Sequence, residues 1–259
     1  MTVSGTLNSA GPDPIGYMDA AARTSVGADY KRRLVEALAV EPGHTALDLG
    51  CGPGTDLDRL ADAVGPTGRV LGVDPDPAML AEARRRLTAR PTVRLCHGDG
   101  HALPLADGSV ERAKVDRVLQ HLAAPGRAVA ELRRVVRPGG LFGMAEPDWD
   151  TLAVSHPDVA FSRTFARFVA GQVRNPTIGR QLVRLVVDCG ARVRSVTPVA
   201  VAFADFDEGD QILGLRRNVA RAIEAGVLAR AAAERWLADL AAGPFLAGFT
   251  FYLVIAESV

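Results

Sequence analysis

The stretch Thr45-Ala-Leu-Asp-Leu-Gly-Cys-Gly-Pro-Gly54 decides the fold of this chain. A short apolar run leads into three glycines at alternate positions, and apolar residues then recur at helical spacing at Leu57, Leu60, Ala61 and Val64. This order predicts a strand, a tight turn and a helix. Glycines at such a turn let the backbone approach a ligand closely, because a β-carbon there would occupy the ligand's space.

The alternation of strand and helix continues outward from this turn. Residues 69–74 form a second predicted strand, after which Asp76 can cap a helix that has Pro77 at its first position. Later elements follow the same pattern, with strands at 92–97, 112–116 and 141–145 and an amphipathic helix at 126–136. Such alternation predicts an α/β fold with a mainly parallel, doubly wound sheet.

Helical segments are predicted on both sides of this unit. Residues 1–14 lack an apolar period and 17–38 have a helical one, so 1–40 are predicted to form a loose arm and a helical lid. The remaining 41–259 form the main domain. After Trp149 the predicted elements are helices at 159–173 and 179–189 and strands at 196–203 and 249–255. Helical cap insertions are expected at about 150–178 and 207–243, because the second is far too long for a turn between neighbouring strands.

Composition narrows the class of partner. The chain has 259 residues with 30 basic and 30 acidic side chains, so no net field would attract nucleic acid or an anionic membrane. A small-molecule substrate is favoured, and we allow for a homodimer. Cys51, Cys96 and Cys189 have no paired metal-ligand spacing, which argues against a disulfide framework and for a reducing cytoplasm. The N-terminus resembles no signal peptide, and no apolar run is long enough to cross a bilayer.

The spacing of the glycine loop and the charge beside it discriminate between cofactors. The loop, Gly50, Gly52 and Gly54, departs by one residue from the dinucleotide fingerprint, which places a pyrophosphate on a helix N-terminus. Asp48 would repel a pyrophosphate but suits a ligand with an ammonium and a sulfonium group. The sequence therefore favours S-adenosylmethionine over NAD. A plain turn between strand and helix is the alternative if the loop is taken alone.

Two further acidic residues follow later strands. Asp74 ends the second strand about 20 residues after the loop, where a carboxylate commonly accepts hydrogen bonds from ribose hydroxyls. Asp99, between Gly98 and Gly100, follows the third strand and could accept from the adenine amine. Taken separately, Asp74 could instead be a charge at a helix N-terminus, and Asp99 could form an Asx-turn. Cys51 has no histidine partner in the sequence and is interpreted as a small space-filling residue.

These motifs resemble those of class I S-adenosylmethionine-dependent methyltransferases, especially the branch of quinone-biosynthesis and natural-product enzymes. The matching segments are LDLGCGPG (47–54), GVDPDPAMLAEAR (72–84), HGDGHALPLADGSVE (97–111), DRVLQHL (116–122) and LRRVVRPGGLF (132–142). The resemblance implies a Rossmann-like seven-stranded sheet with its last strand antiparallel. Residues 196–203 and 249–255 would then be the sixth and seventh strands. It also implies S-adenosylmethionine as cofactor and S-adenosylhomocysteine as product.

The resemblance also implies roles for individual residues. Asp48 and the glycine loop with Cys51 would face the methionine part, and Asp116 would lie near the sulfonium. Arg117 could bind the methionine carboxylate, or pair structurally with Asp116 or Glu146. Tyr17 could close over the cofactor or be an ordinary core tyrosine. The adenosine part would contact Asp74 with Pro75, Met79, and Gly98, Asp99 and Gly100.

The chemistry of methyl transfer suggests few catalytic groups. In-line displacement mainly requires that the nucleophile, the methyl carbon and the sulfur be aligned, and a base near the acceptor can assist it. His121 is the first candidate for that base, although it could equally satisfy backbone in a loop. Asp148 could orient a substrate or bind a cation, or serve as a turn residue. No metal is predicted. Trp149 and Trp236 could wall an acceptor pocket, while Phe161, Phe165 and Phe168 are interpreted as packing.

The sequence thus predicts a methyltransferase acting on an O, C or N atom of a small molecule, such as a secondary metabolite or quinone-like compound in natural-product biosynthesis. Two alternatives keep the same site. One is a non-methylating reaction, such as a cyclisation assisted by the bound sulfonium. The other is a non-catalytic binding subunit.

Overall fold

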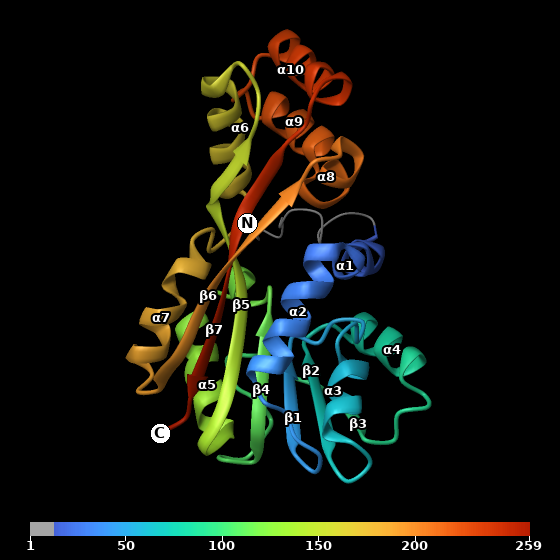
Figure 1. Ribbon diagram of the computed structural model, residues 1–259, viewed down its shortest axis with the longest axis vertical. Helices are drawn as coiled ribbons and strands as arrows, with labels where there is room; N and C mark the ends of the chain where they lie inside the picture. Colours follow the sequence, from blue (N-terminus) through green and yellow to red (C-terminus); the bar gives the residue numbers. More distant parts are fainter. Residues whose placement is uncertain (1–12) are drawn as a thin grey trace.

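The computed structural model describes residues 13–259. Its centre is a seven-stranded sheet of order β3-β2-β1-β4-β5-β7-β6, in which β7 alone runs antiparallel to its neighbours (Figure 1). The strands are β1 (Thr45–Leu49), β2 (Arg69–Asp74), β3 (Val93–His97), β4 (Val110–Asp116), β5 (Val136–Val154), β6 (Arg192–Phe203) and β7 (Ala247–Glu257). The predicted doubly wound sheet with an antiparallel last strand is confirmed.

Helices cover both faces of the sheet. The main elements are α1 (Pro14–Arg23), α2 (Ser25–Ala37), α3 (Leu57–Val64), α4 (Pro77–Arg86), α5 (Pro125–Val135), α6 (Val159–Gly171), α7 (Ile178–Asp188), α8 (Phe206–Leu213), α9 (Leu215–Glu224) and α10 (Arg230–Ala242). Helices α3 and α4 share one buried core with Ala46 and Val70, whereas α5 and α7 share another with Leu47 and Val115. Successive residues of a strand, such as Ala46 and Leu47, thus pack into cores on opposite faces of the sheet, because side chains alternate between the two faces.

The N-terminal lid differs from the single helix predicted at 17–38. Two helices form instead, because Thr24 ends α1 with an extended backbone and then caps α2, its hydroxyl accepting from the Gly27 N–H at 3.0 Å. A capping threonine competes with continuation of a helix in this way. Helix α1 also starts earlier than expected, at Pro14 with Asp13 as its cap. The rest of the predicted arm, 1–12, lies outside the described residues.

The fifth strand is much longer than predicted. Residues 141–145 were expected, yet β5 continues to Val154, and it pairs with β7 as far as Val154 opposite Ala247. Residues 150–154, expected in a cap insertion, therefore belong to the sheet. Helices α6, α8, α9 and α10 form the cap at the outer end of this extension of β5, β6 and β7 (Figure 1).

The cap and the sheet share one apolar core. Buried side chains of α2, such as Leu34, belong to the same cluster as Trp149 on β5 and Trp236 on α10. The cap is therefore packed as part of the domain. No helix among residues 13–259 combines the length and apolar character needed to cross a membrane.

Candidate active site

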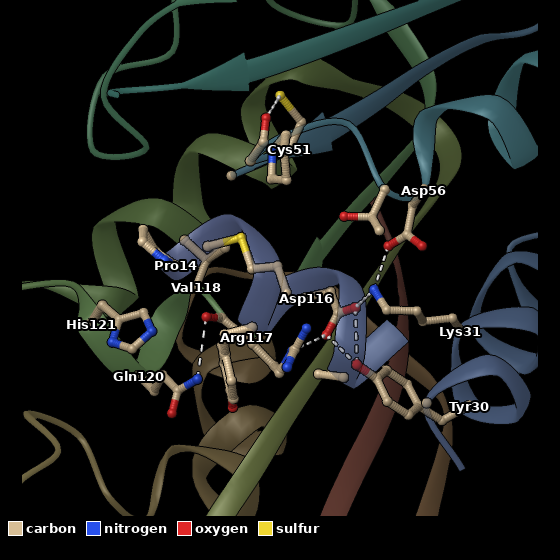
Figure 2. Close-up of a pocket in the computed structure, with 18 of the residues that line it drawn as sticks. Pro14, Tyr30, Lys31, Cys51, Asp56, Asp116, Arg117, Val118, Gln120 and His121 are labelled. Atoms are coloured by element: carbon tan, nitrogen blue, oxygen red, sulfur yellow. Dashed lines mark hydrogen bonds and ion pairs between the residues drawn. The ribbon is translucent and has the colours of Figure 1, made fainter. Parts of the chain in front are cut away.

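A cavity of about 410 Å³ opens at the carboxyl ends of β1, β2 and β4. The glycine loop and Asp74 line one part of it, residues of helices α1 and α2 line another, and Val201, Phe203, Phe249 and Phe251 of β6 and β7 complete the lining. Figure 2 shows Cys51 of the loop, Tyr30 and Lys31 of α2, and Asp116 and Arg117 at the end of β4 around this cavity. Parallel α/β sheets bind ligands at this edge, and the volume is that of a small-molecule site.

The glycine loop has backbone angles that only glycine adopts readily. Gly50 and Gly52 have φ of +71° and +52° and both line the cavity. A β-carbon on Gly50 would lie 2.3 Å from Cγ2 of Val118. Gly54 has a different role, since its hypothetical β-carbon would meet Leu87 and Ala83 of α4. Gly50 thus lets the loop lie close against Val118, Gly52 leaves room beside Met18 at the cavity, and Gly54 allows helix α4 to pack closely.

Cys51 lies between these glycines and lines the cavity. Burial raises the pKa of its thiol well above the ordinary value, and the carboxylates of Asp48 and Asp74 add to the effect. The thiol therefore stays protonated, which does not suit a nucleophile.

Asp74 is held rigidly beside the loop. Its Oδ2 accepts from the Gly52 N–H at 2.9 Å and its Oδ1 from the Asp76 N–H at 2.9 Å. Asp74 is 7% exposed and lines the cavity, as do Pro75 and Met79. Each carboxylate oxygen can accept a further hydrogen bond, so Asp74 is ready to bind hydroxyl groups.

Asp99 does not reach the cavity. Its side chain is 64% exposed, and its Oδ1 accepts from the His101 N–H at 2.9 Å and contacts His101 Nδ1 at 2.7 Å. This is the Asx-turn that the sequence left as an alternative. Gly98 and Gly100 likewise lie outside the cavity lining. The structure therefore does not bring the predicted adenine group of residues to the cavity.

A chain of buried charges forms the floor of the cavity, and sequence reasoning found only Asp48 and Asp116 of it. Lys114 Nζ lies 3.2 Å from Asp48 Oδ1 and donates to Asp56 Oδ2 at 2.7 Å. Lys31 Nζ from α2 donates to the same Asp56 oxygen at 2.6 Å and to Asp116 Oδ2 at 2.5 Å. We call these five residues the charged floor: Lys31, Asp48, Asp56, Lys114 and Asp116. Positive and negative groups alternate along it, which makes burial of so many charges tolerable.

The protonation states of the floor follow from burial and pairing. Burial raises the pKa of Asp48 to about 6, against the opposing effect of Lys114. Burial also disfavours the charged form of Asp56, but Lys114 and Lys31 outweigh it and hold the pKa of Asp56 below its ordinary value. Lys114 stays charged because Asp48 and Asp56 raise its pKa despite burial. At neutral pH the floor is therefore ionised.

Arg117 leaves the end of β4 with a backbone φ of +56°, which is rare for a residue with a side chain. Its guanidinium lines the cavity, with Nε 3.7 Å from Oδ1 of Asp116 (Figure 2). Strain of this kind persists at functional sites where the surroundings enforce it. Of the two partners considered from the sequence, Arg117 is near Asp116 and has no ion pair with Glu146.

Glu146 enforces the turn that contains Arg117. This fully buried carboxyl accepts from the backbone N–H groups of Val118 at 2.8 Å and Leu119 at 2.6 Å. Burial raises the pKa of Glu146 to about 8, although these N–H donors oppose the shift. The contacts fix the short 3-10 helix Leu119–His121 that carries the next cavity residues.

His121 and Gln120 face the cavity from that short helix. His121 Nδ1 is buried and has no hydrogen-bond partner in the described residues. Burial, together with the charge of Arg117, lowers the pKa of His121 to about 4, so the ring is neutral at physiological pH. Gln120 holds the segment in place, since its Oε1 accepts from Trp149 Nε1 at 2.9 Å and its Nε2 donates to the Arg117 carbonyl at 3.2 Å.

Asp148, the other predicted catalytic residue, points away from the cavity. Its carboxylate is fully buried against α7 and forms a two-point ion pair with Arg180, whose Nη2 donates to Oδ1 at 2.7 Å. The reason is that successive side chains of a strand point to opposite faces, and Trp149, the next residue of β5, lines the cavity.

Tyr17 of α1 does line the cavity, as the resemblance implied.

Comparisons with known proteins match the chain to methyltransferases. A family model described as "Methyltransferase domain" matches residues 47–144. A protein of Streptomyces fradiae, described as an uncharacterized 37.1 kDa protein in transposon TN4556, is 51% identical over 253 residues, which are 97% of this chain and 73% of that protein. A demethylmenaquinone methyltransferase of Staphylococcus aureus is 34% identical over 125 residues, 48% of this chain and 52% of that enzyme, so this chain matches about half its length.

The fold also matches a solved S-adenosylmethionine-dependent methyltransferase of Aquifex aeolicus, with a TM-score of 0.55 at 16% identity over 88% of this chain and 89% of that one. The sheet order and the glycine turn define a Rossmann-like methyltransferase fold. The chain contains a methyltransferase domain at residues 47–144, in the fold of class I S-adenosylmethionine-dependent methyltransferases.

Proposed function

We propose that this enzyme binds S-adenosylmethionine against the glycine loop and transfers its methyl group to a small-molecule acceptor under the cap. The acceptor atom would be O, C or N, and the acceptor a secondary metabolite or quinone-like compound. One observation carries the proposal. A single cavity joins the glycine loop and Asp74 at one end to apolar side chains of the extended sheet at the other.

The residues at the loop end fit this cofactor chemically. Gly50 and Gly52 present backbone without β-carbons, and Asp74 has acceptor capacity left for ribose hydroxyls. Asp48 suits the ammonium group, and Arg117 suits the carboxylate of the methionine part. The cofactor itself supplies an electrophilic methyl group on a sulfonium. Its single net positive charge is compatible with a floor in which Lys31 and Lys114 face three aspartates.

The chain's own part in the reaction is alignment and exclusion of water. Helices α1 and α2 cover the cavity with Tyr17, Met18 and Ala21 among the covering residues. A fixed acceptor in line with the methyl group can supply several kcal/mol of the barrier reduction. His121, neutral and unpartnered at Nδ1, is available to hydrogen-bond an acceptor.

Calorimetric titration with S-adenosylhomocysteine tests the cofactor site. We expect Asp74→Asn to weaken binding about 10-fold or more, because an amide cannot accept from both the Gly52 and Asp76 N–H groups and still serve two hydroxyls. The matched control is Asp99→Asn, an exposed carboxyl outside the cavity, for which we expect less than about a 3-fold change. If both variants lost the same S-adenosylhomocysteine affinity, Asp74 would have no special part in binding, and the adenosine would lie elsewhere.

Product mass separates methyl transfer from the two alternatives. Incubation of the wild-type enzyme with S-adenosylmethionine and an acceptor should give S-adenosylhomocysteine and a product heavier by one methyl group. A product of unchanged mass would support cyclisation instead. Cofactor binding with no product from any acceptor would support a binding subunit.

A further inference from the structure

Four aromatic rings form a continuous wall along the cavity. Trp149 stacks on Phe249 with ring centroids 4.6 Å apart, and Phe249 lies 5.8 Å from Phe251. Phe251 stacks on Tyr30 at 4.8 Å. We call these four residues the aromatic wall. Because the Tyr30 hydroxyl donates to Asp116 at 3.2 Å, the wall runs from under the cap to the charged floor.

The outer half of the cavity beside the aromatic wall is apolar. Pairing of β6 with β7 places Val201 opposite Phe249, and Phe203 and Ile212 complete this part of the lining. None of the described residues lining this half carries a charge. Burial of a charged group here would be costly, so the body of a bound acceptor must be uncharged. Aromatic rings add about 2- to 10-fold in affinity per ring contact over saturated groups of similar area.

Among the described residues, polar groups border this apolar space at Gln120, which is bonded to Trp149, and at His121 and Arg117. His121 offers the unpartnered Nδ1, and the guanidinium of Arg117 lies close enough to lower the pKa of that imidazole. This imidazole is too weak a base to take the proton of an aliphatic alcohol. It can accept the proton of a more acidic hydroxyl group while the oxygen bonds to the methyl carbon.

We infer that the acceptor is a planar aromatic compound with an acidic hydroxyl group, a phenol or an enol, that lies against the aromatic wall with its hydroxyl toward His121. This inference rests on the proposed methyl transfer and narrows it to oxygen. The acceptor O–H bond breaks and its proton passes to the His121 imidazole. The oxygen electron pair forms the new bond to the methyl carbon. The bond from that carbon to sulfur breaks with its electron pair left on sulfur, so the products are a methyl ether, S-adenosylhomocysteine and a proton that His121 releases to solvent.

Binding of two bicyclic probes tests the wall. The probes are 1-naphthol and its fully saturated analogue decahydronaphthol, titrated calorimetrically into enzyme saturated with S-adenosylhomocysteine. We expect 1-naphthol to bind about 10-fold or more tightly, and Phe249→Leu to remove about 3- to 10-fold of that preference. The control Phe161→Leu removes a ring that packs on Trp236 in the cap outside the cavity lining, and should leave the preference unchanged.

Turnover of 1-naphthol tests the role of His121. We expect His121→Gln to lower kcat about 10- to 100-fold with little change in the Kd of S-adenosylhomocysteine, and the product to be the methyl ether, which no longer titrates as a phenol. Equal binding of both probes, or a product methylated on carbon, would overturn the inference. Failure of S-adenosylhomocysteine to bind would instead overturn the proposed function, whereas cofactor binding without any naphthol binding would overturn this inference alone.

Discussion

At the residue scale, two glycines with nearly the same φ separate the cost of backbone strain from the cost of a steric clash. Gly50 has φ of +71° and its hypothetical β-carbon would lie 2.3 Å from Val118. Gly139 has φ of +77° and open space around it. We expect Gly139→Ala to lower the free energy of unfolding by about 1 kcal/mol through strain alone. Gly50→Ala should cost about 1–3 kcal/mol more, because Val118 must also shift.

Urea unfolding of both glycine variants measures this difference. Gly50→Ala should also weaken S-adenosylhomocysteine binding at least about 10-fold, while Gly139→Ala should leave it unchanged. Similar stability losses in the two variants would mean that the Val118 contact is relieved at little cost.

The low pKa of His121 predicts a loss of stability in acid. Burial and Arg117 lower its pKa to about 4 in the folded state, whereas an imidazole in an unfolded chain titrates near 6.5. Between these values the unfolded chain binds more protons, so stability falls as the pH falls through this range. At pH 5 the loss from this group should be up to about 2 kcal/mol. In His121→Gln that part of the acid loss should disappear.

The measurement is urea unfolding of wild type and His121→Gln at pH 7 and pH 5. Subtracting the two proteins removes titrations that both share, such as that of Glu146. Parallel loss of stability in the two proteins on acidification would show that His121 titrates normally in the folded state.

At the scale of elements, an ion pair fastens the lid to the Rossmann domain. Asp19 of α1 accepts from both Nη atoms of Arg86 of α4, at 2.8 Å each. A bidentate pair of this kind is geometrically specific. We expect Asp19→Asn to increase the dissociation rate of S-adenosylhomocysteine about 3- to 10-fold, because α1 covers the cavity and would open more readily.

Stopped-flow displacement gives this dissociation rate directly. The matched control is Glu82→Gln, which removes a partner of the same Arg86 within α4 but leaves the contact to the lid. An equal acceleration in both variants would show that the charge of Arg86, and not the fastening of the lid, sets the rate.

Strand parity explains why Asp148, one of the two predicted catalytic residues, lies away from the cavity. Predicted strand 141–145 ended before Glu146, so the alternation of faces was not carried on to Asp148 and Trp149. Because β5 continues to Val154, Trp149 lies on the cavity side and Asp148 on the α7 side. Pro147 lies within this extension of β5, opposite Phe251 of the antiparallel strand β7.

At the scale of the whole molecule, one core joins the cap to the sheet and predicts a single unfolding transition. Trp236 is 2% exposed, packs on Phe165 with centroids 5.0 Å apart, and donates to Ser162 at 3.1 Å. We expect Trp236→Leu to lower the free energy of unfolding by about 3 kcal/mol. The Tm should fall by about 6–12 °C, and the cap and sheet should still unfold together.

Differential scanning calorimetry of Trp236→Leu tests whether the cap and the sheet unfold together. A calorimetric enthalpy equal to the van't Hoff enthalpy would support one cooperative unit. A separate low-temperature transition in Trp236→Leu, with the cofactor-dependent transition unmoved, would mean that the cap unfolds independently.

The sequence by itself determined the parallel sheet, the glycine turn and the acidic residue at the end of β2. These depend on local spacing and turn chemistry, which a linear pattern contains: Gly50 and Asp74 need only their neighbours to be placed. The charged floor needed the tertiary structure, since α2, β1, the start of α3 and β4 each contribute to it. A local signal of it was Lys114, a lysine in the middle of a strand expected to be buried in a parallel sheet. Only the folded chain decides which distant charges meet and which face a side chain takes, because both follow from long-range packing and strand length.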